Sequence, residues 1–316
     1  MDSVEIQIRK RYIKAMRAAN NDRRRRPPRP PKWLPPKKLE REYSLTLVRV
    51  FVKSIEEAVE KFLIPALPSL IPDVNRDRSD AFPQTIDELF AMIHRYTGDE
   101  FSLEDMQSIS RDMANKVSIW NNAQWQKILR SVLGVDLFFD DPALRLATQS
   151  FVSENVSLIK SIRNQSLDRI ESRVYAGIRQ GDRWEGVAKT IREEYGVTER
   201  RARLIGRDQV NKLNGKLTQN RQEQIGVKRY KWRTAIDERV RGNPGGLYPK
   251  AKPSHWHREG NVYNWNEPPK GGHPGIPIQC RCIAEPDLDD LFKETSPIEE
   301  EVESNERRQT TKRRKV

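Results

Sequence analysis

The sequence predicts a mainly α-helical protein with a small, loop-rich α+β module near its C-terminal end and extended basic arms outside the helical body. Three observations lead to this fold class. Apolar residues recur at steps of three and four through most of 39–224, which is the spacing of amphipathic helices. After Gly226 this period is replaced by a short alternating stretch and a long Gly-, Pro- and Asn-rich segment. Charged runs occupy both ends of the chain.

Composition limits the partners and the class of the protein. The 316 residues are 36% hydrophobic and 33% charged, which indicates a modest core with long solvated faces or tails. The net charge of +13 favours a polyanionic partner, nucleic acid first and an acidic protein surface second, although a soluble basic protein without such a partner has the same composition. Two cysteines do not form a disulfide framework, and reduced thiols are the simpler expectation.

No membrane partner is expected from the sequence. No apolar run approaches the roughly 20 residues that a membrane-spanning helix needs. The N-terminal segment also lacks the apolar stretch of a secretory signal.

On these patterns we separate a basic Pro-rich arm (1–42), an N-terminal helical region (43–149) and a charged tail expected to be disordered (287–316). Proline fixes φ and lacks the amide proton, so the Arg/Pro run within the arm is expected to be extended. We predict that the arm and the basic end of the tail contact DNA or a neighbouring subunit, with a solvated linker as the alternative. The candidate nucleic-acid-binding residues are Arg23, Arg24, Arg25, Arg26, Arg29, Lys37, Lys38, Lys312, Arg313, Arg314 and Lys315.

The helical body is predicted from its apolar stripes and its helix-ending residues. A first helix from 39 to 63 is expected to end at Pro65 and Pro68. Further helices are expected at 85–96, from the N-cap Ser102 to Gly134, from Pro142, over 151–180, from Trp184 to Gly196, and from the cap Thr198 to about Gln224. The basic residues of the last helix are spread around it, which favours a solvated surface over a nucleic-acid-binding face. Residues 230–234 are predicted to form a short strand.

The segment from Trp232 to Cys282 holds most of the residue types that carry chemistry. It contains three of the four histidines and both cysteines of the chain. Zinc prefers thiolate and imidazole ligands in a four-ligand shell. Cys280, Cys282 and His255 are therefore candidate zinc ligands, and the fourth ligand is drawn from Asp237, His257 or His273.

A zinc site would explain how this module gains order, because the segment is rich in aromatic residues and poor in aliphatic ones. A single residue between the two cysteines is unusual for a zinc knuckle. The alternative is a pair of half-buried thiols beside hydrogen-bonded histidines.

A catalytic interpretation of the same segment is weaker, and we assign no catalytic residue. His255, His257 and Asp237, with nearby asparagines, are the residue types of a metal-dependent nuclease. They are also ordinary loop residues, and Cys280 has no base or helix N-terminus placed beside it by the sequence. No phosphate loop or dinucleotide fingerprint is present.

The order of residues in this segment resembles that of the Mu F-like phage head morphogenesis proteins. The resemblance is carried by Trp232-x-Thr234-x-x-Asp237-x-Arg239-Val240-Arg241, then Pro253-Ser254-His255-x4-Gly260, and then Cys280-Arg281-Cys282. Upstream, Ala202-Arg203 and Arg207-Asp208-Gln209 are similar to that family's Ala-Arg…Arg-Thr-Glu helix. The residues of structural interest in these motifs are Arg203, Arg207, Asp208, Trp232, Arg239, Arg241, Gly260 and Arg281.

Two departures qualify the resemblance, which covers about 150–286. Asp208-Gln209 stands where the family has Thr-Glu, and 242–252 is an insertion between Arg241 and Pro253. The insertion is expected to lengthen a loop and to shift His255 relative to Asp237.

The resemblance implies a non-enzymatic minor head (capsid) protein of a tailed bacteriophage. Such proteins are encoded beside the portal, join the procapsid in low copy and are tied to the portal vertex. The implied partners are the portal protein, the inner capsid or scaffold, and packaged double-stranded DNA, to which a +13 chain is attracted by counterion release. The rival hypotheses are a metal-dependent nuclease of the packaging machinery and a non-enzymatic DNA-binding protein.

Overall fold

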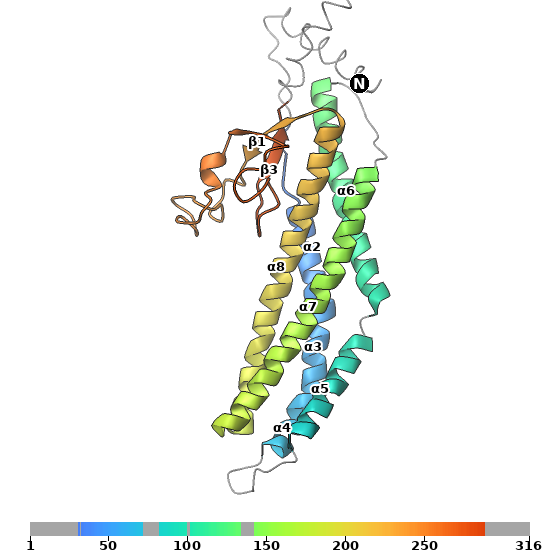
Figure 1. Ribbon diagram of the computed structural model, residues 1–316, viewed down its shortest axis with the longest axis vertical. Helices are drawn as coiled ribbons and strands as arrows, with labels where there is room; N and C mark the ends of the chain where they lie inside the picture. The colour runs from blue at the N-terminus through green and yellow to red at the C-terminus, as the bar shows by residue number, and fades with distance from the viewer. Residues whose placement is uncertain (1–30, 32, 72–81, 100–101, 134–141, 288–316) are drawn as a thin grey trace, which may run out of the picture. The chain divides into compact units, whose positions relative to one another are not determined.

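The computed structural model describes residues 31, 33–71, 82–99, 102–133 and 142–287. Long α-helices and one small antiparallel sheet make up these residues, which confirms the predicted mainly α fold with a small β-containing module (Figure 1). The helical elements are α2 (Lys37–Leu47), the π-helical η1 (Val48–Val52), α3 (Lys53–Ala58), the π-helical η2 (Val59–Leu63), α4 (Ile64–Leu70), α5 (Phe82–Asp99), α6 (Leu103–Leu133), α7 (Pro142–Gln180), α8 (Trp184–Gln224) and the 3-10 turn η3 (Trp256–Arg258). The strands are β1 (Arg229–Arg233), β2 (Val262–Asn264) and β3 (Ile283–Pro286).

The chain forms two compact units, each assembled from separate stretches of sequence. Unit 1 comprises 1–35, 120–141 and 215–316, and unit 2 comprises 36–119 and 142–214. Two of the boundaries between these stretches fall within α6 and α8, so each of these long helices contributes one part to each unit.

Unit 2 is a helical body, and one large apolar cluster packs part of it. The first stretch of helix (37–70), α5, α7 and the N-terminal part of α8 contribute to it. The buried members of this core are Ile55, Ala58, Val59, Leu63, Leu67, Leu70, Ile71, Ile86, Phe90, Ile93, Leu167, Ile170, Val174, Val187, Ala188 and Ile191. The apolar stripes seen in the sequence therefore face one another across the helix contacts, as their spacing predicts.

Buried polar contacts fix the pairing of α7 with α8, which run side by side (Figure 1). The carboxylate of Glu194 is buried and accepts hydrogen bonds from Arg169 (3.1 Å) and Arg173 (2.9 and 3.0 Å). The hydroxyls of Ser166 and Thr198 lie 2.9 Å apart in the same contact. A buried charge that kept no partner would be costly, so these contacts favour one register of the two helices.

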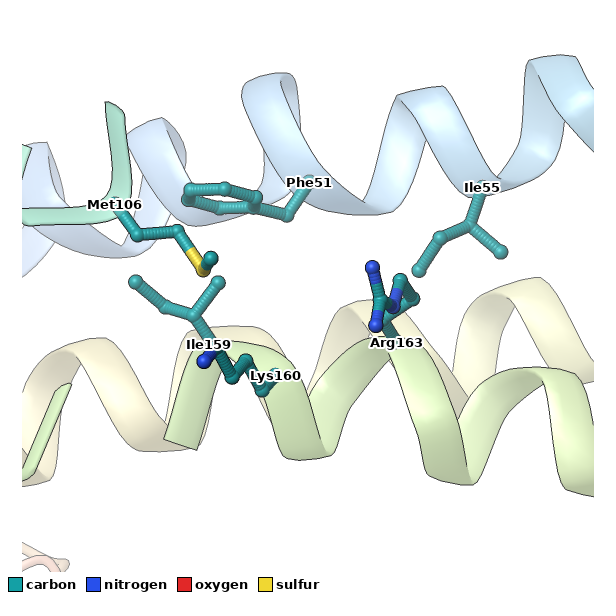
Figure 2. Close-up of a pocket in the computed structure, with 6 residues that line it drawn as sticks. All are labelled: Phe51, Ile55, Met106, Ile159, Lys160 and Arg163. Atoms are coloured by element: carbon teal, nitrogen blue, oxygen red, sulfur yellow. The ribbon is translucent and has the colours of Figure 1, made fainter. Parts of the chain in front are cut away.

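A small cavity lies elsewhere in the same body, between η1, α3, α6 and α7. Figure 2 shows Phe51 and Ile55 pointing towards α7, where Ile159 and Arg163 face them, with the sulfur of Met106 beside Phe51. Its volume is about 10 Å³, which is less than a small-molecule ligand occupies. We therefore treat it as a packing imperfection of the core.

Two predicted helix ends are wrong, because in each case the helix continues past a residue that usually ends a helix. The helix predicted to stop at Pro65 continues through Pro65 and Pro68 to Leu70. Pro65 lies in the first turn of α4, directly after the π-helical η2, where the hydrogen-bond register changes and a missing amide proton is tolerated.

The second correction concerns α8, which is one helix from Trp184 to Gln224 and not two. A helical glycine costs only about 1 kcal/mol relative to alanine, so Gly196 does not end a helix whose apolar face is buried on both sides of it. The hydroxyl of Thr198 does not cap a new helix, because it donates within α8 to the carbonyl oxygen of Glu194 at 3.0 Å.

The predicted N-terminal arm is described only from Pro31 onward, apart from residue 32. Trp33 is buried against Trp125 of α6, with ring centroids 6.1 Å apart. Helix α2 begins at Lys37, before the predicted end of the arm at 42, because Pro36 is the last proline of the run. Lys37 and Lys38 are exposed in the first turn of α2.

The predicted N-cap and N1 signals are confirmed for two other helices. The Ser102 hydroxyl accepts a hydrogen bond from the backbone N–H of Asp105 at 3.0 Å, and α7 begins at Pro142. Among the described helices, none has the length and apolar character needed to cross a bilayer.

We predict that Gly206 permits the close contact between α8 and α2 in unit 2. A Cβ atom at position 206 would lie 2.8 Å from the backbone nitrogen and Cα of Ser44. Gly206→Ala is therefore expected to lower the free energy of unfolding by about 1–3 kcal/mol, as measured by urea unfolding followed by circular dichroism. Gly196→Ala is the matched control in the same helix, because its nearest new neighbour is the flexible Arg200 side chain at 3.5 Å. A Gly206→Ala protein as stable as Gly196→Ala would contradict this account.

Candidate functional site

Strand β1 is the centre of the C-terminal module, which belongs to unit 1. The sheet order is β2-β1-β3, and both neighbours are antiparallel to β1. The side chains of Tyr230 and Trp232 alternate with more exposed ones and are fully buried. With Trp265, Cys280, Cys282 and Ala284 they form a small core that contains aromatic rings and sulfur but no large aliphatic side chain.

The histidine that the sequence singles out, His255, is positioned by the backbone of β1. The N–H of Trp232 donates to Asn261 O, and Gly260 N–H donates to Trp232 O, each at 2.8 Å. Gly260 has φ = +76°, a left-handed conformation that glycine adopts at little cost. These bonds hold the preceding turn η3 against β1, and the His255 ring meets the Trp232 ring edge to face at 5.2 Å.

The insertion at 242–252 is a closed loop, and the residues that flank it are hydrogen-bonded to each other. The carbonyl oxygen of Arg241 accepts hydrogen bonds from the N–H groups of His255 and Trp256 at 2.9 and 3.0 Å. Within the loop, Gly242 N–H donates to Tyr248 O at 2.9 Å. The motif residues Arg241 and His255, before and after the insertion, are therefore adjacent.

His255, Cys280 and Cys282 converge in the buried interior of the module. The Nδ1 atom of His255 lies 3.5 Å from Cys280 Sγ and 3.6 Å from Cys282 Sγ. Their ligand-type atoms all lie within 4.8 Å of one another, and their residues are at most 8% exposed. The structure thus brings together three of the four predicted metal ligands, with His255 more than twenty positions before the two cysteines in sequence.

Local backbone geometry explains how both thiols reach the same histidine. The residues on either side of Arg281 project to the same face, as in an extended strand, while Arg281 points away. Gln279 has φ = +56°, which few non-glycine residues adopt, and it turns the chain into Cys280. The backbone N–H of Gly275 points at Cys280 Sγ at 3.5 Å.

A small cavity adjoins this trio. Its volume is about 20 Å³, and His255, both cysteines, Arg239 and Arg241 are among its lining residues. A cavity of roughly 10–15 Å³ or more holds one water molecule. The space beside the trio therefore admits one water and not a nucleotide.

The electrostatics of the two thiols are unequal. Burial raises the pKa of Cys280, but hydrogen bonds from Cys282 and His255 outweigh burial and bring that pKa well below its usual range. The hydrogen bond to Cys280, together with burial, raises the pKa of Cys282. His255 Nε2 is buried on the other side of the ring and has no hydrogen-bond partner among the described residues.

Asp237, the fourth predicted ligand, is not brought into the trio. Both of its carboxylate oxygens accept hydrogen bonds from the guanidinium of Arg281, with N–O distances of 2.7 Å. The backbone N–H of Arg239 donates to the same carboxylate at 3.1 Å. Asp237 and Arg281, both motif residues, thus clamp the segment before the insertion to the segment between the cysteines.

The two other histidines considered as ligands have different partners. His257 Nδ1 lies 2.7 Å from the Ser254 hydroxyl on the exposed side of η3. His273 Nδ1 lies 2.9 Å from the Tyr230 hydroxyl and its ring packs on Trp265. Within the described part of the chain, neither they nor Asp237 joins a cluster of metal-binding side chains, so the ingredients of the nuclease hypothesis do not converge.

The upstream motif residues lie on α8 in unit 2, where the side chains of Arg203 and Asp208 form ion pairs within that helix. Arg203 pairs with Glu199 at 2.6 Å, and Asp208 is buried and pairs with Lys212 at 2.9 Å. The side chain of Asn211 donates to the carbonyl oxygen of Arg207 at 2.9 Å.

The predicted nucleic-acid-binding residues fall mostly outside the described part of the chain. Lys37 and Lys38 are described in α2. The lysines and arginines at 312–315, and Arg23–Arg26 and Arg29, lie outside the described residues.

Comparison with known proteins now identifies the domain that contains this site. Residues 168–285 match the protein family described as "Phage Mu protein F like protein". This stretch is similar to the Mu F-like proteins. The match confirms the resemblance over nearly the range predicted from the motifs, and it takes in α8, the sheet and the His–Cys trio.

One relative among curated proteins extends the likeness beyond this domain. An uncharacterized protein of Haemophilus influenzae (strain Rd KW20) is 29% identical over 267 residues, which is 83% of this chain and 56% of that protein. The chain therefore spans about half the length of the curated relative it matches. No solved structure matches the chain.

Several residues that build the site were not singled out from the sequence. Gln222, near the end of α8, donates to Ala284 O at 2.8 Å and accepts from Trp265 Nε1 at 3.0 Å. The guanidinium of Arg258 stacks on Trp232 at 4.8 Å. Their sequence signal is weak, because a glutamine late in a helix and an arginine in a loop are common on surfaces.

We predict that His273 titrates below its usual pKa. Burial lowers the pKa of His273, because the packed rings of Tyr230 and Trp265 disfavour the charged imidazole. A depressed folded-state pKa means that this contribution to stability is complete above about pH 6.5 and is lost as the pH falls through the folded value. A two-dimensional NMR titration of the imidazoles measures it, with His273→Phe to assign the signal. A His273 pKa at or above 6.5 would contradict the packing described here.

Proposed function

We propose that this chain is a minor head protein of a tailed bacteriophage, associated with the portal vertex and acting in procapsid assembly, DNA packaging or DNA delivery. The observation that carries the proposal is the Mu F-like domain at 168–285, whose motif residues are built into the module and into α8. The family match supports a phage head protein. We therefore propose that the protein is located in the virion, and in the host cytoplasm while heads are assembled.

The role we propose is structural and not enzymatic. The motif residues Asp237 and Arg281 form an ion pair with each other. The backbones of Trp232 and Gly260 are hydrogen-bonded within the module. The cavity beside the trio has room for about one water molecule, so a phosphodiester does not fit at these side chains. These contacts support a module that presents a fixed surface to the portal protein, the inner capsid or the scaffold.

The charge of the chain supports packaged DNA as a further partner. A net charge of +13 inside a DNA-filled head would be neutralised by phosphates with release of counterions. An acidic portal surface would be attracted by the same charge, so the two partners need separate tests.

The head assignment is tested in particles of a phage whose genome carries this gene. Heads purified away from tails are expected to contain the chain at low copy, detected by mass spectrometry, and an early stop codon is expected to reduce DNA-filled heads. Restoring the full gene in trans is the control. Purified heads that lack the chain, with normal assembly in its absence, would overturn the proposal.

We predict that the basic arm supplies part of the salt-sensitive affinity for DNA. Log affinity falls linearly with log salt concentration. Replacing Arg23–Arg26 and Arg29 by serine should reduce the magnitude of this slope by about 0.9 for each phosphate that the arm no longer neutralises. Fluorescence anisotropy with duplex DNA over a salt series measures the slope. Replacing the exposed Lys37 and Lys38 tests the beginning of α2 separately. An unchanged slope in both variants would contradict the prediction, because neither the arm nor the beginning of α2 would then neutralise DNA phosphates.

A further inference from the structure

The trio of His255, Cys280 and Cys282 has the spacing of three ligands around one tetrahedral ion. Zinc bonds of about 2.3 Å to sulfur and about 2.0–2.1 Å to nitrogen, at a tetrahedral angle, put sulfur and nitrogen about 3.6 Å apart. The two sulfur–nitrogen distances are 3.5 and 3.6 Å. Two zinc-bound sulfurs would lie about 3.8 Å apart, and the ligand-type atoms of the trio all lie within 4.8 Å of one another.

Hydrogen bonding alone accounts for this arrangement less well. A neutral imidazole nitrogen has either one lone pair or one N–H, so Nδ1 of His255 can serve one thiol at full strength. Both Cys280 and Cys282 direct their sulfur at that single atom. A shared cation satisfies three electron-rich atoms that point to one centre.

The surroundings of the trio are those of a soft transition-metal site. Thiolate and imidazole select zinc or a related ion over calcium or magnesium, which prefer oxygen. The Gly275 N–H that points at Cys280 Sγ is the kind of outer contact that orients a thiolate ligand. Asp237 does not compete for the ion, because Arg281 holds both of its oxygens.

We propose that His255 Nδ1, Cys280 Sγ and Cys282 Sγ bind one zinc ion, with a single water molecule from the adjoining cavity as the fourth ligand. The cavity of about 20 Å³ has room for that water and is lined by all three ligand residues. The site takes a divalent soft cation and no larger ligand. Its role is to staple the small aromatic core around β1.

A staple is needed here because the core of the module is small. Its buried side chains are Tyr230, Trp232, Trp265, Ala284 and the two cysteines, with no large aliphatic residue among them. Three-residue and four-residue strands, β2 and β3, flank β1, and the rest of the module is loop. Metal binding to such a segment contributes directly to its folding. This inference concerns the module alone and does not depend on the head assignment.

The test measures zinc in the full-length protein after loading with Zn²⁺ and removal of excess. We expect one zinc per chain in the wild type and none in Cys280→Ser/Cys282→Ser or His255→Gln. The matched controls Asp237→Asn and His257→Gln are expected to keep the ion, because those side chains pair with Arg281 and Ser254 instead. Zinc retained by the cysteine variant, or lost in Asp237→Asn while the fold is kept, would overturn the ligand set.

A second measurement keeps the proposal testable if the variants fail to fold. Wild-type protein loaded with Co²⁺ should show the visible bands of a tetrahedral ion together with thiolate-to-metal charge transfer. Thiol titration of the metal-free, denatured chain should find two free thiols, because both cysteines are free in the structure. Octahedral Co²⁺ spectra, no bound ion, or a Cys280–Cys282 disulfide would each overturn the proposal.

Discussion

The C-terminal module depends on the central position of β1. This strand has a hydrogen-bonded neighbour on each side, and its two fully buried aromatic side chains, Tyr230 and Trp232, belong to the small core of the module. The backbone of Trp232 holds Gly260 and Asn261, which places η3 and His255. Cys282 directly precedes β3, the other neighbour of β1, and is placed by that pairing. The motif residues are thus linked through one strand, although they are spread over fifty positions of sequence.

Within unit 1, the C-terminal part of α8 packs against the module. Gln222 spans from the end of α8 to Ala284 O and Trp265 Nε1, which satisfies a buried indole N–H and a strand carbonyl with one side chain. Gly215 leaves room for the carbonyl oxygen of Pro274, which would lie 2.7 Å from a Cβ at that position. The family match likewise includes α8 together with the sheet. A loop-rich module with a small core needs a rigid element beside it.

The fold class was predictable because helix periodicity and turn residues are local signals. The presence of long helices, the strand β1 and the N-cap Ser102 followed from them. The continuations through Pro65 and Gly196 were not predictable, because tertiary packing outweighs a local cost of about 1 kcal/mol for glycine. In the site, the grouping of His255 with the two cysteines could be proposed from residue types. Asp237 could not be separated from them, because its partner Arg281 is 44 positions away and an acid–arginine pair leaves no local pattern.

The central claim is that the module is organised around β1 with a three-residue metal centre against it. X-ray absorption at the zinc edge of the loaded full-length protein tests this claim most directly. We predict two sulfur scatterers at about 2.3 Å and two nitrogen or oxygen scatterers at about 2.0–2.1 Å, of which one is an imidazole. A shell of nitrogen and oxygen alone, or a zinc ion with a single sulfur ligand, would contradict the convergence of His255, Cys280 and Cys282 described here.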